Sequence, residues 1–416
     1  MKEKNIEVVS SSRIRFEGLE EAVRGKVQDW LQDILAEEVR DFLGREKHER
    51  FGDRLDLSSG YRNGYGKPRK LSLMSGTITV RRPRVRGLEE RFESQVLPLF
   101  KRQSEEIRMM LPELYLHGLA KGDFELALRG LLGEGAPLSP ASIGRLKAKW
   151  KLEHEEWRKA DLSEVEVVYQ WADGIYVKAG LEDHKAALLV IIGALSSGQK
   201  IILACESGQR ESKENWASIL RDLKARGLKL PRLTIADGHL GIWAALGEHH
   251  PQGEEQRCWN HKIVNVLDAL PKKLQDEAKE LLKTMPYEET KALCEKKRDQ
   301  FILRYKKDYP KATEKLMRDW ERMITFYSFP KEHWIHLRTT NIVESPFAAV
   351  RLRTSASKRY KKVESATAMI WKLLKVAEKS FRKINSPEML PAVYAGKLFE
   401  NGIAVTTKTE DLKVAA

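Results

Sequence analysis

The chain has 416 residues, 42% of them hydrophobic and 32% charged, which is typical of a globular protein with two or three domains. Three cysteines are too few for a disulfide framework, no apolar run reaches the roughly 20 residues of a membrane span, and no secretion signal follows the first residues. We therefore expect a cytoplasmic protein. Its formal net charge of +14 favours a polyanionic partner, nucleic acid first and an anionic membrane surface second.

Residues 1–103 are predicted to hold one long helix and a small basic β-unit. Apolar side chains recur every three or four residues from 17 to 47, and Gly44 is placed to end this helix. Between Leu57 and Gly87 there are eight basic residues and no acidic one, while Asn63-Gly64 indicates a hairpin. The alternative to DNA binding is a basic face that is simply solvated. The candidate phosphate contacts here are Arg62, Lys67, Arg69, Arg81, Arg82 and Arg84.

Residues 104–160 are predicted to be helical, with a glycine-containing loop at 133–138. Ser139 is placed to cap a helix whose first residue is Pro140. A helix, a loop and a second helix are typical of a helix-turn-helix DNA-binding region, with Arg145 and Lys149 on the recognition helix. Any small helical domain gives the same pattern.

Residues 161–266 are predicted to form an α/β layer. Strands at 165–178, 185–195 and 200–205 make an antiparallel meander, followed by a helix at 211–226, a short strand Leu233–Ala236 and a helix Leu240–Leu246. Asp173 lies inside the first strand and Asp237 directly follows the fourth. Each precedes a glycine, so the alternative for Asp173-Gly174 is a hairpin turn.

The remaining chain is predicted to be mainly helical. Residues 267–336 form a lysine-rich helical insertion, 337–402 continue the domain of the α/β layer with basic helices, and 403–416 are a polar tail. Eleven basic residues oppose two acidic ones from Arg351 to Lys383. Further candidate phosphate contacts are Lys178, Arg351, Arg353, Lys358 and Arg359.

Glu344 is the third acidic residue of interest. Asn341 and Glu344 have the spacing of a capping box, but Pro346 favours a helix start nearer Ser345, which leaves the carboxylate free. Two aspartates on strands and a glutamate at a helix start suit two Mg²⁺ ions, which take oxygen ligands from few carboxylates, water and phosphate.

Several segments resemble the mutator-type transposases of bacterial insertion sequences. They include Asp173-Gly174, Ile235 to His239, Gln256 to Lys262, Phe329 to Trp334, and Glu344-Ser345-Pro346-Phe347 leading into Val350 to Thr354. The resemblance implies an RNase H-like catalytic domain with a mixed sheet, interrupted by a helical insertion. It also implies a DDE triad of Asp173, Asp237 and Glu344 that holds two Mg²⁺ ions, for which Mn²⁺ substitutes.

Two further motifs belong to the same resemblance. Cys258 and His261 match a Cys-x-x-His signature, which we expect to be structural or DNA-contacting, with zinc as the alternative. His333 and Trp334 are candidates for stacking on DNA, and a packed aromatic pair is the alternative.

The expected function is transposition. The protein would bind terminal inverted repeats and target DNA as a homo-oligomer in a synaptic complex associated with the nucleoid, with no membrane partner. Water would cut the transposon end, and the freed 3′-hydroxyl would then attack the target strand. The alternatives are a nuclease that does not join strands and a non-catalytic DNA-binding regulator.

Overall fold

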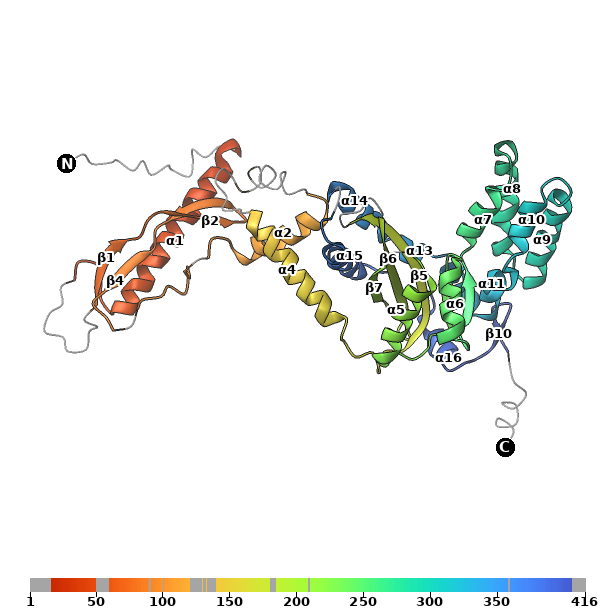
Figure 1. The fold of residues 1–416 in the computed structure, drawn as a ribbon. Helices are drawn as coiled ribbons and strands as arrows, with labels where there is room; N and C mark the ends of the chain where they lie inside the picture. Colours follow the sequence, from red (N-terminus) through yellow and green to blue (C-terminus); the bar gives the residue numbers. More distant parts are fainter. Residues whose placement is uncertain are drawn as a thin grey trace, which may run out of the picture. The chain divides into compact units, whose positions relative to one another are not determined.

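The structure is a computed structural model that describes residues 16–49, 60–89, 91–99, 101–119, 129, 132, 140–179, 185–208, 210–357 and 360–405 (Figure 1). The chain divides into two compact units, Met1–Leu146 and Lys147–Ala416. Each is described by itself. No helix within the described ranges is both long enough and apolar enough to cross a bilayer.

A long helix opens the first unit, as the sequence predicts. Helix α1 (Leu19–Leu43) ends at Gly44, whose φ of 63° is left-handed and whose N–H donates to carbonyls of the last turn. The helix packs on an antiparallel hairpin of β2 (Arg69–Leu73) and β3 (Gly76–Val80). The buried core between them is built from Leu35, Leu71, Ile78, Val80 and Leu97.

Two glutamines of α1 cover the outer edge of β3. Gln32 accepts a hydrogen bond from the Arg81 N–H at 3.1 Å and donates to the Arg81 carbonyl at 2.9 Å. Gln28 accepts from the Thr79 N–H at 2.9 Å. The two glutamines are four residues apart, so they lie on one face of the helix and satisfy main-chain groups that an edge strand otherwise leaves open.

The hairpin predicted at Asn63-Gly64 is wrong. Strand β1 (Tyr61–Tyr65) runs through this pair and bonds to β4 (Pro83–Arg86), with an irregular register between Arg62 and Tyr65. Gly64 has a φ of 63°, so the glycine serves a bulge inside the strand and not a turn between strands. The tight turn lies instead between β2 and β3, where Leu73 pairs with Gly76.

Part of the predicted helix-turn-helix lies outside the described residues. Helix α2 (Glu105–Leu116) is present, and helix α4 (Pro140–Trp157) begins at the predicted proline. Residues 120–128 and 133–139, which would supply the middle helix and the turn, are not described. The helix-turn-helix therefore stays a prediction.

The second unit is built on a five-stranded mixed sheet of order β7-β6-β5-β8-β9. Its strands are β5 (Val167–Lys178), β6 (Lys185–Leu195), β7 (Lys200–Gly208), β8 (Leu233–Ala236) and β9 (Glu254–Arg257). The first three form the predicted antiparallel meander, and β8 joins β5 in parallel. The sequence analysis missed β9, a four-residue edge strand with two leading glutamates, because its composition is not that of a strand.

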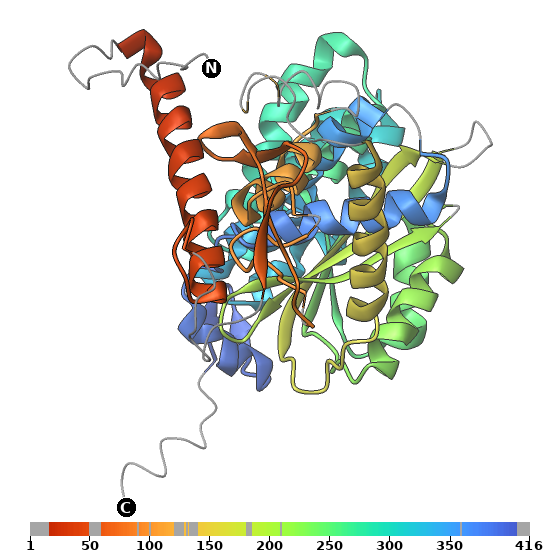
Figure 2. The ribbon, with the colours of Figure 1, turned by 90° about the vertical axis from the view of Figure 1, so that its left-hand side faces the viewer.

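Helices cover both faces of this sheet (Figures 1 and 2). Helices α5 (Lys213–Ala225) and α6 (Leu240–His249) share a core with one face, which includes Trp216, Leu220 and Trp243. Helix α15 (Val363–Glu378) packs on β7, and helix α16 (Leu390–Tyr394) packs on β5. Two residues of the predicted tail, Ile403–Ala404, pair with Phe399–Glu400 as short strands.

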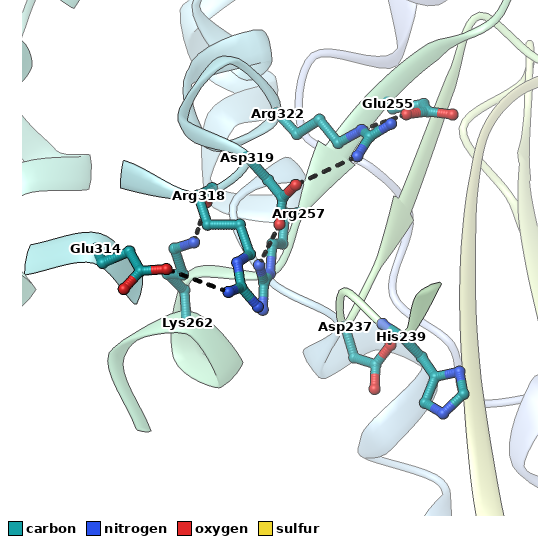
Figure 3. A network of polar contacts seen from close by, with 9 residues as sticks. All are labelled: Asp237, His239, Glu255, Arg257, Lys262, Glu314, Arg318, Asp319 and Arg322. Carbon is teal, nitrogen blue, oxygen red and sulfur yellow. Dashed lines mark hydrogen bonds and ion pairs between the residues drawn. The ribbon is translucent and has the colours of Figure 1, made fainter. Parts of the chain in front are cut away.

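Residues 259–337 are mainly helical (Figure 1), and their assignment as an insertion into the domain stays a prediction. They are α7 (Trp259–Leu267), α8 (Lys272–Thr284), α9 (Lys291–Tyr305), α10 (Pro310–Met317), α11 (Trp320–Ile324) and α12 (Trp334–Leu337). A polar network ties this region to the sheet (Figure 3). Arg257 at the end of β9 pairs with Asp319 at 2.6 Å, and Asp319 also pairs with Arg322 at 3.5 Å.

Lys262 on α7 is buried within the same network. Its Nζ donates to the Arg318 carbonyl, and its side chain is 1% exposed. Burial, together with the nearby guanidinium of Arg257, lowers the pKa of Lys262 to about 7. The folded protein therefore binds fewer protons at this site than the unfolded chain does between pH 7 and the ordinary lysine pKa, so stability rises with pH through that window.

We predict that the Lys262→Met substitution destabilises the folded protein least at low pH. Between pH 6 and pH 9, the free energy of unfolding of the variant should fall relative to wild type by about 1–3 kcal/mol, because neutral Lys262 keeps its hydrogen bond without a buried charge. Urea denaturation at several pH values measures this difference. Lys279→Met, at an exposed position of α8, is the control and should show no such trend. A constant difference across this range contradicts the prediction.

Candidate active site

Asp173 lies in the middle of β5, where it pairs with Val190 of β6, so the alternative of a hairpin at Asp173-Gly174 is wrong. The residue is 9% exposed. Its Oδ1 accepts a hydrogen bond from the Gly174 N–H at 2.8 Å. The parallel pairing of β5 with β8 ends one residue earlier, at Ala172 and Ala236, so Asp173 and Asp237 each directly follow the last residue of this pairing.

Asp237 follows the last residue of β8, in a turn that leads into α6. Its Oδ1 accepts from the His239 N–H at 2.8 Å, which closes the turn. Gly238 has a φ of 106°, and a Cβ added there would lie 2.6 Å from Cζ of Arg257. The guanidinium of Arg257, which pairs with Asp319 (Figure 3), therefore lies where any side chain at position 238 would be. Only a glycine leaves this space open.

Glu344 ends a short helix, α13 (Asn341–Glu344), and helix α14 (Phe347–Ser357) begins after Pro346. Thr340, and not Asn341, is the N-cap of α13, so the proposed capping box is not formed. Glu344 accepts a hydrogen bond from the Thr340 hydroxyl, and its Oε1 lies 3.9 Å from Nδ1 of His261.

All four residues of the Cys-x-x-His segment contact the chain around Glu344. Cys258 is buried, its Sγ accepts from the Thr340 N–H at 3.3 Å, and it lies 3.2 Å from the Thr340 hydroxyl oxygen. The Trp259 N–H donates to the Arg338 carbonyl at 2.9 Å, and Nδ2 of Asn260 donates to Oδ1 of Asn341 at 3.0 Å. His261 approaches Glu344, as described above. The segment therefore fixes the position of Glu344. The role of Thr340 was not predicted, although a hydroxyl residue directly before a helix is a sequence signal for an N-cap.

The three acids influence one another. Burial raises the pKa of Asp173 to about 7, and the carboxylates of Asp237 and Glu344 add to that rise. A hydrogen bond with Cys258, with further contributions from the carboxylates of Glu344 and Asp237, raises the pKa of His261 to about 9. An imidazolium thus supplies positive charge among the acids at neutral pH.

These residues offer two sets of possible metal ligands. The carboxylates of Asp173, Asp237 and Glu344 are hard oxygen donors, the type that Mg²⁺ prefers, and a divalent cation would offset the effect of Asp237 and Glu344 on the pKa of Asp173. Among the described residues, these three do not form a group whose ligand atoms all lie within 4.8 Å of one another. The ligand atoms of Cys258, His261 and Glu344 lie within 4.8 Å of one another, a set of the type that binds zinc. Zinc binding stays an alternative, because the Thr340 N–H already donates to Cys258 and the Thr340 hydroxyl donates to Glu344.

The candidate DNA contacts fall into four groups, the last of which is buried. Exposed side chains are those of Lys67, Arg81, Arg84, Arg145, Lys149, Lys178 and Arg351, and Arg82 is half-buried. Arg62 donates to the carbonyls of Arg45 and Glu46, and Arg69 donates to that of Pro98, so both also stabilise the fold. Lys358 and Arg359 lie outside the described residues.

Three candidates are buried and do not offer their side chains to DNA in this structure. His333 is 0% exposed and its Nδ1 lies 2.8 Å from the Tyr169 hydroxyl. Trp334 donates to the Phe329 carbonyl at 2.8 Å and stacks edge-on against Phe326. The packed alternative therefore describes this pair. Arg353 is 2% exposed on the inner side of α14, which corrects its assignment as a phosphate contact.

We predict that Gly238→Ala destabilises the protein by about 1–3 kcal/mol, because the new Cβ meets Arg257 and alanine is strained at positive φ. The control is Gly247→Ala on α6, where a Cβ meets nothing within 4 Å. This control should stabilise by up to about 1 kcal/mol, since alanine is the better helix former. Thermal and urea denaturation measure both. Equal effects of the two substitutions would show that Arg257 does not constrain the turn.

Comparison with known proteins identifies the family. The sequence profile described as "Transposase, Mutator family" matches residues 1–383. The transposase for insertion sequence element IS6120 of Mycolicibacterium smegmatis is 42% identical over 301 residues, which cover 72% of this chain and 93% of that protein. The transposase for element IST2 of Acidithiobacillus ferrooxidans is 42% identical over 293 residues, which cover 70% of this chain and 99% of that protein. The chain therefore belongs to the Mutator family of transposases.

Proposed function

We propose that this chain is the transposase of an insertion sequence and that it cuts and joins DNA with Asp173, Asp237 and Glu344 as a catalytic triad. The observation that supports the triad is electrostatic. Asp173 is buried in β5, and the carboxylates of Asp237 and Glu344, from two other elements, both raise its pKa. Acids from a turn after a strand and from a short helix thus both act on the acid inside β5.

The triad would hold two Mg²⁺ ions, or Mn²⁺ in their place. Such a pair of ions activates an attacking oxygen and stabilises the leaving oxygen of a phosphodiester. Asp173, whose backbone is paired with Val190 of β6, would provide a ligand from the sheet. Asp237 and Glu344 would supply the other protein ligands, with Thr340 and the Cys-x-x-His segment holding Glu344 in place.

Two displacements at phosphorus complete the proposed reaction. In the first, a water oxygen attacks the phosphorus at the transposon end, the bond to the 3′ oxygen breaks, and that oxygen takes up a proton. In the second, the new 3′-hydroxyl loses its proton and attacks a target phosphodiester, whose own 3′ oxygen leaves. Bond number is conserved in the second step, so no external energy source is required.

The architecture supports further parts of this proposal. Three antiparallel strands followed by two parallel ones, with helices on both faces, are consistent with an RNase H-like sheet. The exposed basic residues of both units would bind phosphates of terminal repeats and target DNA, in a complex of several copies of the chain. Affinity for DNA should then fall as salt rises.

We predict that Asp237→Asn abolishes both end cleavage and strand transfer on oligonucleotides that carry the element's termini. The loss should exceed about 100-fold, the upper range for groups outside a metal's coordination shell. The exposed acid Asp222 on α5 provides the control, and Asp222→Asn should retain both activities. Cleavage without joining by the wild type would favour a nuclease. Terminus binding without chemistry would favour a regulator, and an active Asp237→Asn variant would exclude the triad.

We predict that Asp173→Asn stabilises the metal-free protein at pH 8. The raised pKa means that the folded protein binds more protons than the unfolded chain between about pH 4 and pH 7, so its stability falls as pH rises through this window. Asparagine does not ionise, so the variant avoids this loss of stability. Its free energy of unfolding should therefore exceed that of wild type by about 2–4 kcal/mol at pH 8 and should not differ for this reason below pH 4. Urea denaturation in chelator measures it. A variant that is less stable than wild type at pH 8 would contradict the assigned environment.

A further inference from the structure

A fourth acid, Glu211, is buried beside Asp173 and has no part in the reaction above. It belongs to the segment between β7 and α5 and is 6% exposed. A Cβ added to Gly174, the residue after Asp173, would lie 2.6 Å from Cδ of Glu211. Gly174 therefore leaves the space into which the Glu211 side chain fits, directly beside the strand that carries Asp173.

The main chain of Glu211 is held against the helix that follows Asp237. A Cβ at Gly241, in the first turn of α6, would meet the Glu211 carbonyl and would lie 2.8 Å from the carbonyl carbon of Ser212. Ser212 in turn caps α5 by accepting from the Asn215 N–H at 3.3 Å. Two glycines thus place Glu211 between the segments that carry Asp173 and Asp237.

The surroundings of the Glu211 carboxylate are those of the catalytic site. Burial raises its pKa and the charge of Asp237 raises it further, while a hydrogen bond with Tyr176 and the charges of His239 and His261 act in the opposite direction. Among the residues that the structure describes, no lysine or arginine forms an ion pair with Glu211. A buried carboxylate without a cationic partner is costly unless something supplies positive charge.

We propose that Glu211 is a fourth carboxylate of the catalytic site, a positioning residue that accepts hydrogen bonds from water molecules on the divalent cation bound by Asp173 and Asp237. This inference rests on the proposed function. Mg²⁺ keeps several of its water ligands in proteins, and those waters need acceptors in the layer around the ion. Glu211 provides such an acceptor without replacing any member of the triad.

The test is metal binding by the full-length protein without DNA, measured by titration calorimetry with Mn²⁺. Glu211→Gln keeps the size of the side chain and its contact with Tyr176 but removes the charge, and it should weaken Mn²⁺ binding by about 10–100-fold. The matched control is Glu206→Gln, a partly buried glutamate on β7 that pairs with Arg158 at 2.6 Å and should leave the affinity unchanged. Tyr176→Phe, which removes the hydrogen bond and keeps the charge, should also bind Mn²⁺ as wild type does.

Two further variants separate the possible failures. If Asp237→Asn binds Mn²⁺ as tightly as wild type, the proposed function itself fails. If Asp237→Asn loses binding while Glu211→Gln retains wild-type affinity, the role of Glu211 alone is refuted. A Tyr176→Phe variant as weak as Glu211→Gln would also refute it, since the hydrogen bond would then be the cause. Should Glu211→Gln not fold, Glu211→Asp keeps the charge on a shorter side chain and should weaken binding less than 100-fold.

Discussion

A carboxyl group buried in the centre of a sheet, beside two other acids, is the constraint on which the second unit depends. The backbone of Asp173 is paired with Val190 of β6, while the pairing of β5 with β8 ends at the residue before it. The elements that carry Asp237 and Glu344 are held by other contacts. Arg257 packs against the turn of Asp237, and Thr340 binds Glu344, so each of these two acids has its own polar support.

The helical insertion is part of that support. Asp319 holds the guanidinium of Arg257, and Arg322, which pairs with Glu255 on β9, also lies 5.2 Å from the ring of Trp243 on α6. Lys262 donates to the carbonyl of Arg318 between α10 and α11. The residues that steady the Asp237 turn are thus about 80 residues further along the chain, and the insertion and the sheet form one packed structure. Removing the insertion would also remove the partner of a buried arginine.

Sequence patterns predicted the helices and strands whose formation depends on their own residues. Apolar periodicity placed α1 and the strands β5 to β8, and Gly44 marked the end of α1. The predictions failed where a distant segment determines the local structure. Asn63-Gly64 forms a bulge because β4 pairs along it. Trp334 is buried by segments that sequence spacing does not reveal. The acids themselves were identified through family resemblance, whereas Thr340, Arg257 and Glu211 act through contacts across the fold and leave no local signature.

The pairing of Gln28 and Gln32 with β3 has a consequence for how copies of the chain could associate. With these side chains in place, the outer edge of β3 has no free N–H or carbonyl at Arg81 and no free N–H at Thr79 to offer a strand from another molecule. Sheet extension, the commonest route by which an exposed β-ribbon recruits unintended neighbours, is closed along this stretch. The first unit therefore offers another copy of the chain neither the Thr79 N–H nor the main-chain groups of Arg81 for strand pairing.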